Sequence, residues 1–421
     1  LYSITWSKEG YAPFELTGYP ISDNTLLEDV TLFSGSLQEV AGEVSGNWPV
    51  GNIYVVTGDI IIPEGEMLTI AEGVMVRFNA GTGMVCNGSL IANGTDEAPV
   101  YFTSSNPTPS SGEWTGIELY AENNVLSHIV YEWAEDGITG AGASGSVFDH
   151  VDMDDTLLPT ANGFVFTSSS DMSFTNSYIR VAGSYGINVT DGQNSIVIGN
   201  DISEPTSAAI YFTNASGSEF SDNDLVTTGL YASNANGSIA SGNTIYTGYG
   251  GAAIDMQNCD NCEIDGNSIT GPPVGMQGGF TTMGPSGGIS SSNSDNAIIS
   301  NNEMDVSSYG ISSQNSTGVI IEYNNVIFSN HNWGINFHGS ENATIKYNRL
   351  IGVGRSNGIY NGASNQNAVV SNNLNLKSDK NIGRFFTPDK QGILNYHSLD
   401  FYYDLDVSNL LPNAIYIFPD P

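Results

Sequence analysis

The chain has few cysteines, few basic residues and no long apolar run. Three Cys among 421 residues argue against a scaffold held by disulfides. No stretch of 18 apolar residues occurs, so we expect no membrane-spanning helix. The chain also lacks an initial Met and a signal-like apolar segment, from which we expect Leu1 to follow a removed leader.

Basic residues are scarce and unevenly placed. Ten Lys and Arg against 45 Asp and Glu give a formal charge of −35. This charge disfavours nucleic acid as a partner and suits an extracellular surface. Seven of the ten bases lie between Lys346 and Lys390, where Asp379 and Asp389 are the only acids, so this segment carries +5 and the remainder −40. The segment is either a cap that shields the last coil or a surface for head-to-tail docking or acidic glycans.

The chain is instead rich in a short repeat. Eleven times between Gly116 and Leu374 it restarts with Gly or Ala followed by an apolar residue, at spacings of 20 to 26 residues and one of 35. Fourteen residues after each of the last eight openings Asn recurs, and an apolar residue follows two positions later. The eight periodic residues are Asn200, Asn223, Asn243, Asn267, Asn302, Asn324, Asn348 and Asn372. Self-similarity of this length is typical of a solenoid.

The content of each repeat predicts the kind of solenoid. Short runs such as Ile196-Val197-Ile198 are separated by Gly, Asn and Ser, with no helical period. A leucine-rich repeat would need a Leu-rich scaffold, and a hexapeptide helix a six-residue period; both are absent. The sequence therefore predicts an all-β fold, a right-handed parallel β-helix of roughly 13 coils. We expect the periodic Asn to take the left-handed conformation in a tight turn and to bond the Asn of the adjacent coil.

The segment from Asn52 to Ser105 contains the opening of the same helix. Its run GDIIIPEGEMLTIAEGVMVRFNAGTGMVCNGSLIANGTDEAPVYFTSS resembles the first coils of secreted pectate-lyase-like and parallel β-helix repeat proteins. The resemblance covers roughly residues 52 to 376. It implies the fold and leaves the activity open, because this superfamily includes lyases, hydrolases, adhesins and phage spikes.

Both ends of the chain leave the repeat. We assign residues 1–50 to an N-terminal extension or cap, 51–376 to the β-helix, and 377–421 to an aromatic, partly basic cap or assembly segment. The open ends of a β-helix need cover. The final apolar run also suits pairing with a sheet edge of the same chain or of a neighbour. The predicted assembly residues are Arg349, Arg355, Lys377, Lys380, Arg384, Ile415, Tyr416, Ile417 and Phe418.

Enzymes of this fold that cleave acidic polysaccharides need a cation beside the uronate carboxylate and a Lys or Arg base. Between Gly116 and Thr344 the one basic residue is Arg180. The sequence therefore predicts no cleavage of pectin, alginate or chondroitin.

A catalytic alternative lies in the run from Asp149 to Asp155. Asp149 stands twelve residues after Gly137 and His128 twelve after Gly116, so we expect these two side chains to stack in adjacent coils. Asp152 and Asp154 alternate on a strand and should lie about 7 Å apart, which an inverting glycosidase can use. The catalytic set of this alternative is His128, Asp149, Asp152 and Asp154.

The same acidic run admits two further interpretations. Its carboxylates could hold Ca²⁺ through Asp149, Asp152 and Asp154. They could also form a solvated acidic face, to which Glu132, Glu135 and Asp136 would add from the preceding coil. The sequence indicates no other cofactor.

The step of 35 residues inserts about a dozen residues between Gly271 and Gly288. Insertions into solenoid turns collect on one face and often form a binding lip. The aromatic residues expected to line a carbohydrate-binding lip are Phe280, Trp333, Phe337 and Tyr360. Isolated surface aromatics are the alternative.

We therefore predict a secreted, acidic cell-surface protein with a structural or adhesive function. Head-to-tail contacts would make it a self-assembling homo-oligomer, a subunit of an extracellular filament or layer, with polysaccharide as a further ligand. The alternative is a polysaccharide lyase or glycoside hydrolase that acts on the lateral face. An enzyme needs basic and acidic groups together in mid-solenoid, whereas a subunit needs complementary ends. The sequence shows complementary ends more clearly, so it favours an assembly subunit over an enzyme.

Overall fold

The computed structural model describes residues 2–6, 14–19, 36–154, 157–247, 251–271, 286–328, 333–352, 357–361, 367–377 and 394–400. These residues form strands, turns and irregular segments, and none of them builds a helix that could cross a membrane. The chain divides into two compact units. Unit 1 contains Leu1–Thr190 and Glu204–Thr206, and unit 2 contains Asp191–Ser203 and Ser207–Pro421.

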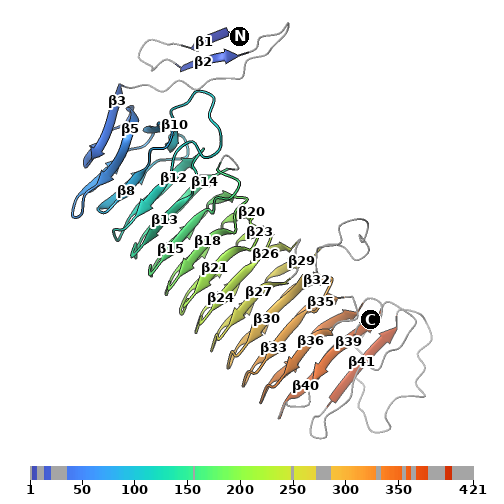
Figure 1. The fold of residues 1–421 in the computed structure, drawn as a ribbon. Coiled ribbons are helices and arrows are strands. Elements are labelled where there is room, and N and C mark those ends of the chain that lie inside the picture. The colour runs from blue at the N-terminus through green and yellow to red at the C-terminus, as the bar shows by residue number, and fades with distance from the viewer. Residues whose placement is uncertain are drawn as a thin grey trace. The chain divides into compact units, whose positions relative to one another are not determined.

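Unit 1 is built from short strands of successive coils that lie side by side and pair in parallel (Figure 1). Only β1 and β2, among its described strands, pair antiparallel. Its strands are β1 (Tyr2–Trp6), β2 (Phe14–Tyr19), β3 (Leu37–Glu43), β4 (Gly46–Trp48), β5 (Ile53–Ile62), β6 (Met67–Ile70), β7 (Met75–Phe78), β8 (Met84–Cys86), β9 (Ser89–Asn93), β10 (Val100–Ser104), β11 (Ile117–Leu119), β12 (Val125–Tyr131), β13 (Ile138–Ala141), β14 (Val147–Met153), β15 (Phe164–Thr167), β16 (Ser173–Thr175), β17 (Tyr178–Arg180) and β18 (Tyr185–Thr190).

Unit 2 has the same construction, with parallel pairing between strands of successive coils. Its strands are β19 (Ile196–Ile198), β20 (Asp201–Ser203), β21 (Ala208–Thr213), β22 (Glu219–Ser221), β23 (Asp224–Thr227), β24 (Leu230–Ser233), β25 (Ile239–Ser241), β26 (Thr244–Thr247), β27 (Gly251–Gln257), β28 (Glu263–Asp265), β29 (Ser268–Thr270), β30 (Ser286–Ser292), β31 (Ile298–Ser300), β32 (Glu303–Val306), β33 (Ile311–Gln314), β34 (Ile320–Glu322), β35 (Asn325–Phe328), β36 (Trp333–His338), β37 (Thr344–Lys346), β38 (Arg349–Gly352), β39 (Asn357–Asn361), β40 (Val369–Lys377) and β41 (Leu394–Asp400). The predicted all-β parallel solenoid of about 13 coils is confirmed.

Parallel pairing extends beyond the range that the sequence analysis assigned to the β-helix. At the N-terminal side β3 already pairs in parallel with β5, and β4 pairs with β6. At the C-terminal side β40 pairs in parallel with β41. Strands within residues 1–50 and 377–421 thus continue the pairing pattern of the coils next to them.

The interior of each unit is filled by inward-facing apolar side chains. In unit 1 Phe148, Phe164, Phe166 and Phe174 form one aromatic cluster, with ring centroids 4.8 to 6.1 Å apart. In unit 2 the apolar residues that recur two positions after the periodic Asn form an aliphatic ladder in register, all buried: Ile202, Leu225, Ile245, Ile269, Met304, Val326 and Leu350. Leu374, the last residue of this series in the sequence, is one position out of register, because Leu350 pairs with Asn375. Large buried side chains of this kind provide most of the stabilisation of such a fold.

The Asn ladder of unit 2 is confirmed from Asn200 to Asn348. From Asn223 onward, each side-chain oxygen accepts hydrogen bonds from the backbone N–H and the amide group of the Asn one coil earlier, at 2.9 to 3.1 Å. The last member is Asn373 and not Asn372, since Asn348 donates to the Asn373 oxygen. From Phe337 to Thr344 the chain advances seven residues, but from their partners Asn361 to Val369 it advances eight, which accounts for the shift.

The expectation that the ladder Asn adopts the left-handed conformation is wrong. That conformation belongs to the residue directly before it, for example Asp222 at φ 55°, Asn301 at 55°, Tyr323 at 57° and Tyr347 at 56°. The left-handed residue turns the chain, and the following Asn points inward and is buried. The amide ladder therefore satisfies polar groups inside the turn, while the side chain before it points outward.

Candidate functional site

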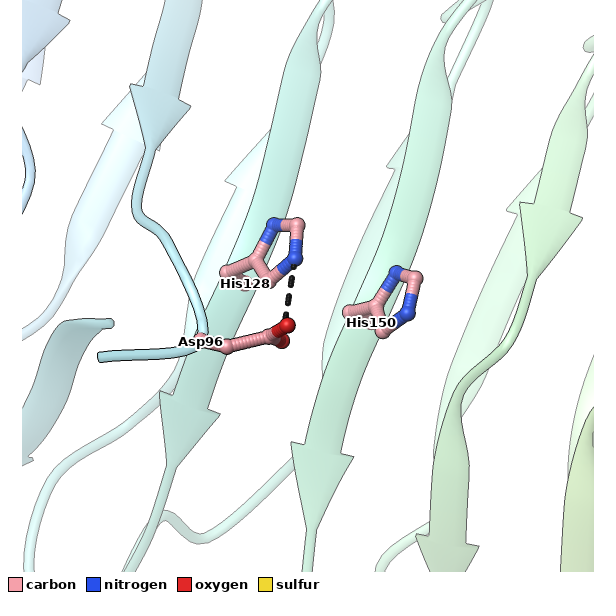
Figure 2. Close-up of side chains that lie close together, drawn as sticks. All are labelled: Asp96, His128 and His150. Atoms are coloured by element: carbon pink, nitrogen blue, oxygen red, sulfur yellow. Dashed lines mark ion pairs between the residues drawn. The ribbon is translucent and has the colours of Figure 1, made fainter. Parts of the chain in front are cut away.

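The same kind of turn in unit 1 presents two histidines. His128 in β12 and His150 in β14 both have φ 52°. The strand register places Ser127 opposite Asp149 and Ile129 opposite Val151, so the two His are neighbours in adjacent coils. Figure 2 shows the two rings side by side on neighbouring strands. They stack with centroids 4.5 Å apart and an interplanar angle of 5°.

The predicted stacking of His128 on Asp149 is therefore wrong by one residue. Between Leu119 in β11 and Val125 in β12 the chain advances six residues, but between their partners Gly140 and Val147 it advances seven. The additional residue shifts β14 by one position relative to the Gly137 opening. His150 was not among the predicted site residues, although its spacing of 22 from His128 equals the register of these strands.

The Nδ1 atom of each histidine is held by a neighbouring side chain. His150 Nδ1 lies 2.9 Å from Asp149 Oδ2, and His128 Nδ1 lies 2.9 Å from Ser127 Oγ. Asp149 in turn accepts hydrogen bonds from Thr175 Oγ1 at 2.7 Å and Asn176 Nδ2 at 2.9 Å. Burial alone would raise the pKa of the Asp149 carboxyl, but these hydrogen bonds and His150 outweigh it and lower that pKa.

Asp96 completes the histidine cluster from the turn between β9 and β10. Its Oδ1 lies 3.3 Å from His128 Nε2 (Figure 2). Hydrogen bonds between Thr95 and Ala98 close this turn, and Gly94 N–H donates to the Ser127 carbonyl at 2.8 Å. One ligand atom each from Asp96, His128 and His150 lies within 4.8 Å of the others, the single such set among the described residues. Sequence analysis missed Asp96 because turn geometry, not periodicity, places it there.

A second group of polar side chains covers the outer face of β10, β12, β14 and β17. Thr103 Oγ1 donates to Glu132 Oε2 at 3.0 Å. Burial raises the pKa of the Glu132 carboxyl; the charges of Asp152 and Asp154 act in the same direction, and hydrogen bonds from Thr103 and Trp133 oppose it. Burial, and then the charge of Asp154, also raise the pKa of Asp152. We call Glu132, Asp152 and Asp154 the acidic face.

Neighbouring residues frame the acidic face. On one side Asp152 pairs with Val130, which in turn pairs with Tyr101; on the other side Asp152 pairs with Tyr178. These four residues form one row across the strands. The Arg180 guanidinium lies 4.0 Å from Asp154 Oδ1 and donates to Glu204 Oε1 at 2.9 and 3.2 Å. Arg180, the one basic residue between Gly116 and Thr344, thus lies beside this face and is paired with carboxylates.

Buried aromatic residues fix the backbone beneath the acidic face. The Trp114 indole stacks on Phe78 at 4.1 Å and donates to the Glu132 carbonyl at 2.7 Å. The buried Tyr131 hydroxyl donates to the carbonyls of Asp136 and Gly137 at 2.9 and 3.0 Å. These contacts hold the turn after β12, so Glu132 is presented by a rigid element.

The predicted acidic set is only partly brought together. Asp152 and Asp154 share the acidic face with Glu132, which the sequence analysis named only as a neighbour. Asp149 instead points to Thr175, Asn176 and His150, so the three carboxylates predicted to hold Ca²⁺ have different surroundings. The calcium site stays a prediction.

The predicted carbohydrate lip needs one correction. Trp333 and Tyr360, on β36 and β39, are neighbours with ring centroids 4.9 Å apart, and Tyr360 is exposed. Phe337 is 1% exposed and belongs to the core, so its ring is not available to a sugar. Phe280 lies outside the described residues.

Most predicted assembly residues also lie outside the described residues. These are Arg355, Lys380, Arg384 and the run from Ile415 to Phe418, and the side chain of Lys377 is likewise not described. Arg349 is exposed on β38 and donates to Asn325 Oδ1 at 2.8 Å. The assembly surface stays a prediction.

Comparison with known proteins supports the fold. Family models match three segments: a pectate-lyase-like β-helix domain at residues 43–136, a right-handed β-helix region at 110–225, and the periplasmic copper-binding protein NosD at 224–396. The resemblance to the right-handed parallel β-helix superfamily is thus confirmed. Comparison with curated proteins finds no match.

Similar solved structures include three β-helix proteins of different function. A lacto-N-biosidase from Eubacterium ramulus has a TM-score of 0.37 and 15% identity over 78% of this chain and 62% of its own, so the chain spans less than two thirds of it. The surface adhesin PfbA of Streptococcus pneumoniae has a TM-score of 0.40 and 9% identity over 79% and 82%. The periplasmic alginate epimerase AlgG has a TM-score of 0.45 and 14% identity over 76% and 78%. These likenesses concern the fold alone.

Proposed function

We propose that the protein is a cell-surface or periplasmic β-helix that binds a neutral polysaccharide on the acidic face of unit 1. The observation that carries this proposal is the gathering of Glu132, Asp152 and Asp154 on one outer surface, beside Trp133 and in a row with Tyr178. Carboxylate oxygens accept hydrogen bonds from sugar hydroxyls, and aromatic rings offer apolar faces for the sugar ring.

The charge of this surface favours uncharged sugars. Three carboxylates lie together there, and the nearby guanidinium of Arg180 is already bonded to Glu204. A uronate polymer would bring further negative charge to this face and would be repelled. Neutral chains meet no such repulsion.

Hydrolysis of the bound chain is a second candidate function, and the raised pKa of Glu132 favours it. A carboxyl with a raised pKa keeps its proton to a higher pH than an ordinary one and can protonate a leaving-group oxygen, while an ionised partner activates water or attacks the sugar. Glu132 would be the acid, and Asp152 or Asp154 the partner. In this arrangement the polysaccharide-binding face and the catalytic site coincide.

Affinity electrophoresis of the full chain in gels that contain neutral polysaccharides tests the binding proposal. We expect retardation in at least one gel, with affinity reduced tenfold or more by Asp152→Asn and Asp154→Asn. Asp171→Asn is the matched control, because Asp171 is exposed, removed from the acidic face, and in a left-handed conformation that Asn tolerates. Equal retardation of all variants would contradict the proposal.

The release of reducing ends from the same polysaccharides separates binding from hydrolysis. If the protein hydrolyses its ligand, Glu132→Gln should abolish product formation even at polysaccharide concentrations that saturate binding. Retardation without products in wild-type protein would leave binding as the function and remove hydrolysis.

A structural role in a filament or layer is an additional proposal, supported by the charge distribution of the chain. Residues 346–390 carry +5 and the remainder −40, which is the complementarity that a head-to-tail contact needs. Assembly would present the acidic face many times along one polymer and so increase avidity for a repetitive polysaccharide.

A further inference from the structure

We propose that Asp96, His128 and His150 bind one divalent transition-metal ion, Zn²⁺ or Cu²⁺. Two imidazole nitrogens and one carboxylate oxygen are donors that both ions accept, whereas Ca²⁺ and Mg²⁺ prefer oxygen donors alone. The site lies within unit 1 and is separate from the acidic face. It also lies outside residues 224–396, which match the copper-binding family model.

The donor atoms are close enough to share one ion. They lie within 4.8 Å of one another, and two donors each about 2.1 Å from a metal lie at most about 4.2 Å apart. The Asp96 side chain, which is 79% exposed, is free to move. The two imidazole rings, which stack at 5°, must tilt on binding so that both Nε2 lone pairs point at one ion. The His128 and His150 side chains are 24% and 43% exposed, so an ion can enter from solvent and keep a water ligand.

The surroundings of the two rings match those of metal-binding histidines. A histidine that binds metal through Nε2 commonly uses Nδ1 for a hydrogen bond to a carboxylate or another oxygen, which fixes the ring. Here Asp149 holds Nδ1 of His150 and Ser127 holds Nδ1 of His128. Asp149 is itself fixed by Thr175 and Asn176. Both Nε2 atoms are thereby left for the ion, and that of His128 already faces Asp96.

The backbone brings the three residues together before any ion arrives. Parallel pairing between β12 and β14 fixes the separation of the two histidines. Gly94 packs so closely on β12 that an added Cβ would lie 2.4 Å from the His128 carbonyl oxygen. The turn that carries Asp96 is therefore attached directly to the residue that carries one imidazole. Metal binding therefore requires side-chain rotations but no rearrangement of the backbone, which limits the entropy lost on binding.

The test is a calorimetric titration of the full chain, treated with EDTA and dialysed, with Zn²⁺ and separately with Cu²⁺. Excess Ca²⁺ is present to occupy acidic surface sites. We expect one tight site per chain, weakened tenfold or more by His128→Asn and by His150→Asn, and weakened also by Asp96→Asn. Asn is the conservative choice because Asn176 occupies the corresponding left-handed turn position in the next coil at φ 50°.

Two control variants accompany these measurements. Glu97→Gln removes the same charge from the same turn as Asp96→Asn, and His338→Asn removes an exposed imidazole in unit 2. Both should bind metal like wild-type protein. Melting curves without metal show whether each variant is folded, and metal should raise the melting temperature of wild-type protein and of the controls only.

The electron paramagnetic resonance spectrum of bound Cu²⁺ provides a second measurement. Wild-type protein should show coupling to two imidazole nitrogens, and each single His→Asn variant to one. The proposal is overturned if wild-type protein has no site tighter than its His128→Asn variant, or if His338→Asn reduces binding as much as His150→Asn.

Discussion

Asn302 is a buried turn residue whose side-chain polar groups are all hydrogen bonded. Its oxygen accepts from the backbone and side chain of Asn267, and its amide donates to Asn324 Oδ1 and to the Ile264 carbonyl, all at 2.9 Å. One side chain thus joins three coils. Removal of it leaves buried donors and acceptors without partners, which costs more than the bonds themselves contribute.

We expect Asn302→Ala to lower the free energy of unfolding by about 1–3 kcal/mol. Urea denaturation followed by circular dichroism measures the change. The control is Asn301→Gly, one residue earlier: Asn301 is exposed at φ 55°, and Gly takes the same position in other coils at Gly242 and Gly266. If both variants unfold at the same urea concentration, the ladder does not stabilise the unit as described.

A second prediction at the residue scale concerns Glu132 and the dependence of stability on pH. Its pKa in the folded protein is raised, so the folded state binds more protons than the unfolded state between the two pKa values. The contribution of Glu132 to stability therefore decreases as pH rises from its ordinary range through its folded pKa. The Glu132→Gln variant has no carboxyl at this position and therefore does not lose this stability as pH rises.

The measurement is the melting temperature of wild-type protein and of the Glu132→Gln variant from pH 4 to pH 8. The variant should gain stability relative to wild-type protein as pH rises, since Gln still accepts a hydrogen bond from Thr103. Glu135→Gln, which removes one carboxyl from an exposed position in the same turn, is the control. A gain for Glu132→Gln that shrinks with rising pH would contradict the assignment.

Single residues also show where prediction from the sequence ends. Asn200 to Asn348 could be predicted because every coil in that stretch keeps fourteen residues between the opening and the Asn. Asp149 and Asn372 were placed one position wrongly because the chain contains one additional residue shortly before each of them. Counting along the chain assumes that all turns have the same length. The true register is set by hydrogen bonds between strands, and an additional residue lies in the loop between them.

At the scale of elements, the turn between β9 and β10 shows how the fold positions a side chain without any repeat. Gly94 N–H donates to the Ser127 carbonyl at 2.8 Å, and an added Cβ would meet the His128 oxygen at 2.4 Å and Pro99 Cα at 2.8 Å. The turn therefore lies directly against β12, and only a residue without a side chain permits this contact.

We expect Gly94→Ala to destabilise unit 1 by about 1–3 kcal/mol, the usual cost of overpacking. The matched control is Gly58→Ala, where the added Cβ would lie 3.5 Å from the Ala41 Cβ, an ordinary contact. Thermal unfolding of both variants beside wild-type protein measures the effect. Equal melting temperatures for the two variants would show that the turn can move away from β12.

Strand patterns explain both the correct and the incorrect predictions at this scale. Alternating apolar residues predicted the aliphatic ladder from Ile202 to Leu350, because residues two apart share a face of a strand. The same rule should have placed Phe337 inside, two residues after the buried Ile335. The acidic face was harder to predict, because Glu132 lies just beyond β12 and gains its environment from Thr103 and Asp152 on other coils.

At the scale of the whole chain, the distribution of charge has a consequence for solution behaviour. Cations concentrate between residues 346 and 390, and acids elsewhere. Among the described cations, Lys346 already contacts Glu322 at 2.9 Å and Arg349 contacts Asn325 at 2.8 Å. Association between the basic segment of one copy and the acidic remainder of another would be sensitive to salt where the contact stays exposed to solvent.

Assembly of the full chain tests this consequence. A head-to-tail contact repeats without closing and builds filaments rather than dimers, so light scattering at micromolar concentration should show species much larger than a monomer. Deletion of residues 412–421 removes the run Ile415–Phe418 and should leave a folded monomer, because pairing of this run with a neighbouring sheet edge would be lost. Charge reversal at Lys377 and Arg384 should slow assembly mainly at low salt, since screening at high salt already removes that attraction. A full-length protein that stays monomeric, or a truncated one that assembles equally well, would contradict the proposed head-to-tail assembly.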